Sequence, residues 1–187
     1  MKKGKIAGKL KNPSKDLMTV EWKNKQVVMI DQTKLPGKLV FRRYKKYEDV
    51  ARAIERLIVR GAPAIGIAAA FGMSLAAISS KAKTHSALLK ELKIAYDRLR
   101  STRPTAVNLA WALDKIMSVA ASKNNVEDIK KSILLSALNM ATDDITTNKK
   151  LGMNGAEIIR NDDVILTHCN AGSLATVTYG TALGVLR

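Results

Sequence analysis

An arginine beside a glycine, at the junction of two helical patterns, is the first feature of this sequence that could do chemistry. The run Arg60-Gly61-Ala62-Pro63 ends one amphipathic stretch and opens an apolar one. Glycine permits close backbone approach, a helix start offers unpaired N–H groups, and a guanidinium can hold a phosphate with two hydrogen bonds. The run is therefore a candidate anion site, and it also fits a helix C-cap followed by an exposed arginine.

A second arginine and the single cysteine offer further candidates. Arg103 precedes Pro104, where a helical pattern must stop, and is either an anion ligand or a surface arginine that closes a helix. Cys169 follows an apolar run that predicts a buried strand, and a loop and a helix are expected after it. Both a strand end and a helix N-terminus favour a reactive thiolate, whereas a small buried apolar role is the alternative.

The residue types and their spacing give little support for a metal site or for a Ser-His-Asp catalytic triad. One cysteine and two histidines without a CxxC pair fall short of a zinc ligand set. His168 alternates to the other side of the predicted strand and is interpreted as structural. The polar loop 170–173 offers backbone N–H groups for an anion, although one glycine is a weak signal. The residue types therefore predict no zinc site.

The elements that must hold these residues begin with a small β unit. Residues 18–22 and 26–30 are rich in β-branched and apolar residues, a polar turn separates them, and 39–41 offer a third strand. Helical periodicity then predicts five helices. They are expected at 47–58, at 63–78, at 88–99, after an N-cap at Thr105, and from an N-cap at Asn125 to about 147.

The C-terminal stretch has a different pattern. Residues 164–167 predict a parallel strand, 168–173 a loop and 174–186 a helix, which is how a doubly wound α/β domain opens. A single βα unit cannot form a parallel sheet. The expected fold is an α+β N-terminal domain, a small β unit plus a helical bundle, at 17–160. A basic flexible tail precedes it at 1–16, and the first βα unit of a truncated Rossmann-like domain follows at 161–187.

Composition narrows the class of protein. With 187 residues, 47% hydrophobic and 26% charged, the chain is an ordinary globular protein, which excludes wholesale disorder. One cysteine excludes a disulfide scaffold and favours a reducing cytoplasm. The apolar stretch 61–80 contains proline, glycine and serine and is dominated by alanine, so it predicts a core helix rather than a membrane span.

The charge is unevenly distributed and points to an anionic partner. The whole net charge of +16 resides in residues 1–103, which hold 24 basic and 8 acidic side chains. Nucleic acid, a membrane surface and a phosphorylated small molecule all fit such a surface. Aromatic residues make up only 4%, without the basic-aromatic interleaving that stacks bases, so nucleic-acid binding is disfavoured.

Several sequence blocks, in order, resemble one known family, that of methylthioribose-1-phosphate isomerase. The resemblance covers about 17–187, and the order of the blocks makes it more specific than any single motif. The blocks are DQTKLP at 31–36, RGAPAIGIAAA at 60–70, TRPTAVNL at 102–109, LTHCNAGSLA at 166–175 and YGTALGVLR at 179–187.

The resemblance implies a function and a set of site residues. Family members convert methylthioribose 1-phosphate to methylthioribulose 1-phosphate in methionine salvage, without metal or nicotinamide, usually as homodimers. By resemblance, Arg60, Gly61, Ala62 and Arg103 bind the sugar phosphate and Cys169 is the active-site cysteine. The family's catalytic aspartate belongs to the C-terminal domain, so this chain is expected to be a fragment, a truncated product or half of a split enzyme with a C-terminal partner chain.

Two alternatives remain from the same superfamily. One is a ribose-1,5-bisphosphate isomerase, which the form of the RGAPAIG block disfavours. The other is a non-catalytic regulatory subunit related to translation initiation factor 2B, which needs no complete active site. Cys169 and Arg60 argue against that reading, because a regulatory subunit has no chemical need for either.

Overall fold

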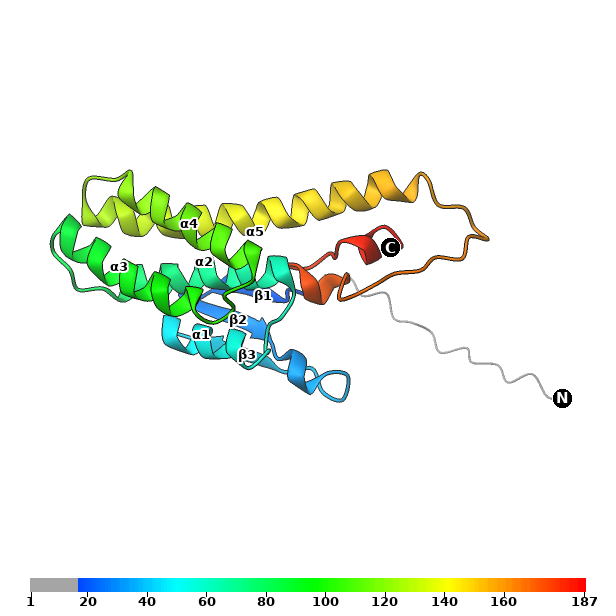
Figure 1. Ribbon diagram of the computed structural model, residues 1–187, viewed down its shortest axis with the longest axis horizontal. Coiled ribbons are helices and arrows are strands. Elements are labelled where there is room, and N and C mark those ends of the chain that lie inside the picture. The colour runs from blue at the N-terminus through cyan, green and yellow to red at the C-terminus, as the bar shows by residue number, and fades with distance from the viewer. Residues whose placement is uncertain (1–16) are drawn as a thin grey trace.

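The computed structural model describes residues 17–187 (Figure 1). The first part of this range forms a three-stranded antiparallel sheet. The strands β1 (Val20–Lys23), β2 (Gln26–Ile30) and β3 (Phe41–Tyr44) pair in sequence order. Asn24 and Lys25 both have positive φ, the backbone of a two-residue turn that matches the twist of a hairpin. The predicted hairpin is confirmed, and the third strand begins at the end of its expected range. The tail expected at 1–16 lies outside the described residues.

Five helices follow, as the periodicity predicts. The caps Thr84 and Asn125 accept hydrogen bonds from backbone N–H groups of the first turns that follow them. The expected N-cap at Thr105 is wrong, because the helix begins one residue later with Ala106 as its cap. The helices are α1 (Tyr47–Glu55), α2 (Ala62–Ser79), α3 (His85–Arg100), α4 (Val107–Ala121) and α5 (Val126–Ala156).

Helix α2 is the centre of the core. It contacts the other four helices and the sheet, and its small residues let those neighbours approach closely. A β-carbon on Gly66 would lie 2.9 Å from the carbonyl oxygen of Asn108, so α4 lies directly against α2. By length and composition α2 is the one described helix that could cross a membrane, and 72% of it is buried inside the protein. It is a core helix here.

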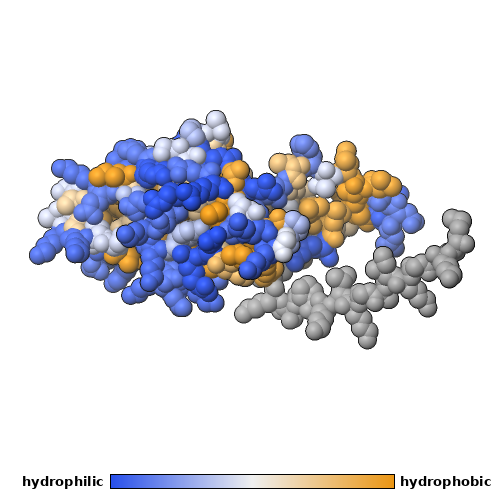
Figure 2. All heavy atoms as spheres, turned by 90° about the horizontal axis from the view of Figure 1, so that it is seen from below, coloured by the Kyte–Doolittle hydropathy of each residue, from blue (hydrophilic) through white to orange (hydrophobic). Residues whose placement is uncertain are grey.

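The expected βα unit at the C-terminal end does not form in this structure. Residues 164–167 are extended without a strand partner, and two short 3-10 turns, η2 (Ser173–Ala175) and η3 (Ala182–Gly184), replace the helix expected at 174–186. A strand requires a neighbour to hydrogen-bond, and among residues 17–187 none lies beside this run. Val164 and Leu166 are almost fully exposed, and Figure 2 shows apolar side chains gathered at this end of the molecule.

The last part of the chain nevertheless returns to the body of the protein. Figure 1 shows it beneath α5, where a β-carbon on Gly152 would lie 2.7 Å from the carbonyl oxygen of Gly184. The N–H of Thr19 donates to the carbonyl of Val177 at 2.7 Å, and the N–H of Val177 donates to Oδ2 of Asp144 at 2.7 Å. Residues 173–178 are thereby fixed between the start of the sheet and α5.

Candidate anion-binding and active site

Three of the predicted site residues line one open pocket. Arg60 and Arg103 lie around a cavity of about 570 Å³ together with Cys169, and the remaining lining residues are Leu57 and Asn170. The three predicted residues come from distant parts of the chain, so the tertiary fold assembles the cluster. Their predicted roles in binding and catalysis remain predictions.

The connection between α1 and α2 positions Arg60. Leu57 adopts a left-handed backbone with φ 57°, which turns the chain sharply after the end of α1. Gln32, at the start of the short turn η1 (Gln32–Lys34), then ties this connection to the C-terminal loop. Its N–H donates to the carbonyl of Ile58 at 3.0 Å, and its Nε2 donates to the carbonyl of Leu174 at 2.9 Å. One residue, through its backbone N–H and its side chain, thus holds the loops that carry Arg60 and Cys169.

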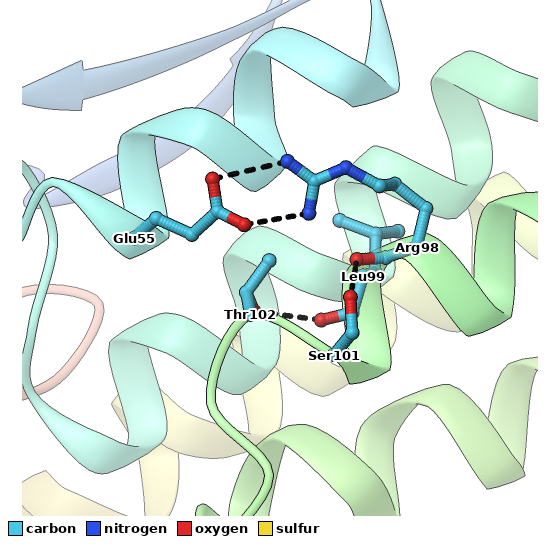
Figure 3. Close-up of polar contacts among 5 residues, drawn as sticks. All are labelled: Glu55, Arg98, Leu99, Ser101 and Thr102. Atoms are coloured by element: carbon cyan, nitrogen blue, oxygen red, sulfur yellow. Dashed lines mark hydrogen bonds and ion pairs between the residues drawn. The ribbon is translucent and has the colours of Figure 1, made fainter.

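The C-terminal end of α3 positions Arg103. Arg98 forms a two-pronged ion pair with Glu55 of α1, at 2.7 and 3.0 Å, as Figure 3 shows. The hydroxyls of Ser101 and Thr102 donate to the carbonyls of Arg98 and Leu99, which satisfies acceptors that a helix end leaves free (Figure 3). The segment directly before Arg103 is therefore fixed to both helices.

The backbone at Cys169 is unusual. Its φ is 67°, a region that non-glycine residues rarely adopt, and such strain is frequent at functional sites. Cys169 is exposed and opens onto the pocket. Within residues 17–187, however, neither a strand end nor an α-helix N-terminus adjoins it, so the geometric reason that the sequence offers for a thiolate is not present in this structure.

The electrostatics of the pocket favour an anion. Two lining atoms, Nη1 of Arg103 and Nδ2 of Asn170, are buried without a hydrogen-bond partner among the described residues. Both are donors, and leaving such groups unpaired in the interior costs about 1–3 kcal/mol each, more for a charged group. All the lining residues lie within 17–187, and no carboxylate is among them. The arrangement therefore calls for a ligand with several acceptor oxygens.

Gly61 and Ala62 do not line this pocket. Gly61 is the N-cap of α2, and a β-carbon there would lie 2.1 Å from Cα of Ala175, so its backbone is packed against the C-terminal loop. Ala62 is exposed at the first turn of α2. Their predicted contact with a ligand stays a prediction, and the structure supplies a packing reason for the glycine. Residues 17–187 hold no group of three or more metal-ligating side chains.

The sequence did not indicate that the side-chain amide of Asn170 is a donor in the pocket. The available signal was its place beside Cys169 in the His-Cys-Asn run, where only backbone N–H groups were considered. Gln32 was likewise quoted only within a motif, and nothing local indicates that it bridges two loops. The bridging role of Gln32 depends on its hydrogen bond to Leu174, 142 residues further along the chain.

Comparison with known proteins identifies the class. Residues 58–187 match the model of the Initiation factor 2 subunit family, and the chain belongs to that family. Among curated relatives, the methylthioribose-1-phosphate isomerase of Geobacter metallireducens is 46% identical over 171 residues, and that of Thermosipho melanesiensis is 44% identical over 170. These alignments cover 90% and 91% of this chain and 49% of each relative, so the chain spans about half their length.

Solved structures show the same fold. The 5-methylthioribose 1-phosphate isomerase from Pyrococcus horikoshii superposes with a TM-score of 0.85 at 47% identity, over 90% of this chain and 48% of that chain. The translation initiation factor eIF-2B, subunit delta, from A. fulgidus superposes with a TM-score of 0.83 at 44% identity, over 91% and 50%. The sheet and five-helix bundle thus match about half of each of these structures.

Proposed function

We propose that this chain is the N-terminal, phosphate-holding part of a methylthioribose-1-phosphate isomerase. The observation that carries the proposal is the pocket that joins Arg60, Arg103 and Cys169, in which donors of Arg103 and Asn170 are buried without a partner among residues 17–187. The isomerase relatives, at 44 to 46% identity, support the same substrate. The substrate is a phosphorylated sugar, and the proposed site needs neither a metal nor a cofactor.

The phosphate would be held by side chains that the fold has already oriented. Arg60 and Arg103 offer guanidinium groups to the phosphate oxygens, and Asn170 adds an amide donor. Fixing the phosphate also fixes the sugar carbon that bears it, which lowers the entropic cost of reaching the reactive geometry. Cys169 lies in the same pocket, where it can act on the carbons next to the phosphate.

The reaction requires cleavage of the bond between C1 and the ring oxygen, movement of the C2 hydrogen to C1, and net transfer of the C2 hydroxyl proton to the former ring oxygen on C4. The phosphate stays on C1 throughout, so atoms balance without an external oxidant or reductant. Cys169 would share the proton movements with an acid from the other half of the enzyme. We therefore expect turnover to require residues outside this chain.

Reconstitution tests the proposal. The 187-residue chain, alone and mixed with the C-terminal half of the Geobacter metallireducens relative, is assayed with methylthioribose 1-phosphate and with ribose 1,5-bisphosphate. We expect turnover of the first substrate by the mixture only, and its loss in Cys169→Ser. Turnover by the chain alone, or a mixture that associates and prefers the second substrate, would overturn the assignment.

The regulatory alternative also has one observation in its favour. The eIF-2B subunit delta structure from A. fulgidus resembles the chain nearly as closely as the isomerase structure does. Co-purification from the native host separates the two readings. Recovery with initiation-factor subunits, and with no isomerase activity in the recovered complex, would favour a regulatory subunit.

A further inference from the structure

A second basic pocket lies on the other side of the connection that carries Arg60. It has a volume of about 220 Å³ between β3 and α1. Its lining alternates with that of the candidate active site along the chain: Arg56 and Ile58 face this pocket, whereas Leu57 and Arg60 line the other. The two pockets share no residue. The lining residues are Arg42, Tyr44, Asp49, Arg52, Ala53, Arg56 and Ile58.

The carboxylates near this pocket are already paired. Asp49 is bound by Arg52, and the buried Asp31, which directly follows β2, accepts from Nε of Arg42 at 3.0 Å. The side chain of Arg56 makes no hydrogen bond or ion pair with any residue in the described part of the chain. Guanidinium donors therefore exceed the carboxylate acceptors at this place, and the excess is positive charge.

The hydroxyl of Tyr44 supplies the second, independent observation. Its oxygen is buried and has no hydrogen-bond partner among the described residues. Burial raises the pKa of this hydroxyl, so it remains a neutral O–H donor under physiological conditions. An unpaired buried hydroxyl is costly, whereas an acceptor in the pocket would satisfy it.

We propose that this second pocket binds a small phosphorylated metabolite through its phosphoryl group, at a site separate from the candidate active site. Tetrahedral oxygens accept from the O–H of Tyr44 and from the guanidinium groups of Arg52 and Arg56. Arginine suits this task because its planar fork matches two phosphate oxygens. The small volume favours one phosphoryl group over a nucleic-acid backbone, which needs a row of such contacts.

Inorganic phosphate is the probe for this site. The full chain carrying both Arg60→Gln and Arg103→Gln, which disable the candidate active site, is titrated with phosphate by calorimetry at constant ionic strength. We expect saturable binding to persist in this background and to weaken about tenfold or more on adding Tyr44→Phe or Arg56→Gln. Arg43→Gln, which removes the same charge from β3 outside the pocket, should leave the affinity unchanged.

A stability measurement separates a ligand role from a structural one. Tyr44→Phe removes a hydroxyl that has no partner among residues 17–187, so the variant should unfold in chloride at the same temperature as the parent or slightly higher. In the background that carries Arg60→Gln and Arg103→Gln, phosphate should raise the unfolding temperature, and adding Tyr44→Phe should reduce that rise. Absence of saturable binding in the parent background, or equal stabilisation of both proteins by phosphate, would overturn the proposal while leaving the isomerase assignment standing.

Discussion

Gly61 and Ala175 touch through their backbones: a β-carbon on Gly61 would lie 2.1 Å from Cα of Ala175 and 2.4 Å from its carbonyl oxygen. Gly61 directly follows Arg60, and Ala175 lies six residues after Cys169. This contact therefore sets the separation between the loops that carry an arginine and the cysteine of the candidate site. Only a residue without a side chain allows it.

Replacing Gly61 by alanine should destabilise the protein. The added carbon collides with backbone, which cannot rotate away, so we expect a loss of about 2 kcal/mol or more in the free energy of unfolding. Urea unfolding followed by circular dichroism measures it. Gly37→Ala is the matched control, because its β-carbon would meet only the carbonyl oxygen of Lys34 at 3.7 Å. Equal stability of the two variants would contradict the contact.

The ion pair between Glu55 and Arg98 should make a pH-dependent contribution to stability. The hydrogen bonds from Arg98 lower the pKa of Glu55, against the opposing effect of burial. Because the folded pKa lies below the ordinary value of 4.5, the contribution is complete above that value and is lost as the pH falls through the folded pKa. Both side chains are about one-third exposed, so we expect Arg98→Gln to cost only about 0.5 kcal/mol at pH 7.

Urea unfolding of the parent and Arg98→Gln at pH 7 and pH 3 checks this prediction. The difference between them should be smaller at pH 3 than at pH 7. Lys93→Gln is the control, since it breaks a pair with Asp97 in which both side chains are well exposed. It should leave stability unchanged at either pH, and a difference for Arg98→Gln that does not decrease as the pH is lowered would show that the ion pair is not its cause.

Asp144 should show the opposite dependence on pH. Burial raises its pKa, and hydrogen bonds from the N–H of Val177 and from Asn148 oppose the shift. In the window between the ordinary value of 3.8 and the raised folded value, the native state binds more protons. The contribution of Asp144 to stability therefore decreases as the pH rises through that window, and above the folded pKa it stays at its lowest value.

Substitutions at Asp144 separate its charge from its hydrogen bond. Asp144→Asn keeps an acceptor for Val177 and removes the buried charge, so stability at pH 7 should be equal or higher. Asp144→Ala leaves the Val177 N–H unpaired and should cost about 1–2 kcal/mol. Unfolding curves of both, beside the exposed Asp143→Asn on the same helix, provide the measurement. Equal loss in the asparagine and alanine variants would refute this account.

Cys169 allows a direct test of the candidate site, because it is the only cysteine in the sequence. Phosphate bound between Arg60 and Arg103 should shield the thiol, so its alkylation by iodoacetamide should slow as phosphate is added. We expect Arg103→Gln and Asn170→Ala each to weaken this protection about tenfold, since each removes a donor to the anion. In Arg43→Gln, phosphate should slow the alkylation of Cys169 as much as it does in the parent. Unchanged protection in Arg103→Gln would remove that arginine from the site.

Local sequence patterns predict most of this fold because its elements are local. The stripe at 47–58 and the cap at Asn125 indicate their helices directly, and hydrogen bonds within each helix satisfy them. Arg60, Arg103 and Cys169 were each recognisable from neighbours in the sequence. Their meeting in one pocket follows from tertiary packing, such as the Glu55–Arg98 pair, that no local pattern encodes.

The conformation of the C-terminal segment, in contrast, could not be predicted from its local sequence pattern. The apolar run 164–167 has the composition of a strand, but a parallel strand exists only when another strand hydrogen-bonds to it. The resemblance indicated the ancestry of this segment, and the hydrogen bonds of residues 17–187 determine its conformation in this structure. The unpartnered donors of Arg103 and Asn170 were equally hidden, because burial is a property of the folded chain.

Val164 and Leu166 should make this chain self-associate. Their side chains are 101% and 96% exposed, and no described residue covers them. Burying one such side chain is worth about 1.5–3 kcal/mol, so contact between copies through this segment is favourable. Sedimentation velocity should show concentration-dependent association of the parent, reduced in the double variant Val164→Ser with Leu166→Ser. Because these side chains are not buried against any of residues 17–187, the variant should unfold within about 0.5 kcal/mol of the parent. Unaltered association in the double variant would show that another surface of the protein mediates the self-association.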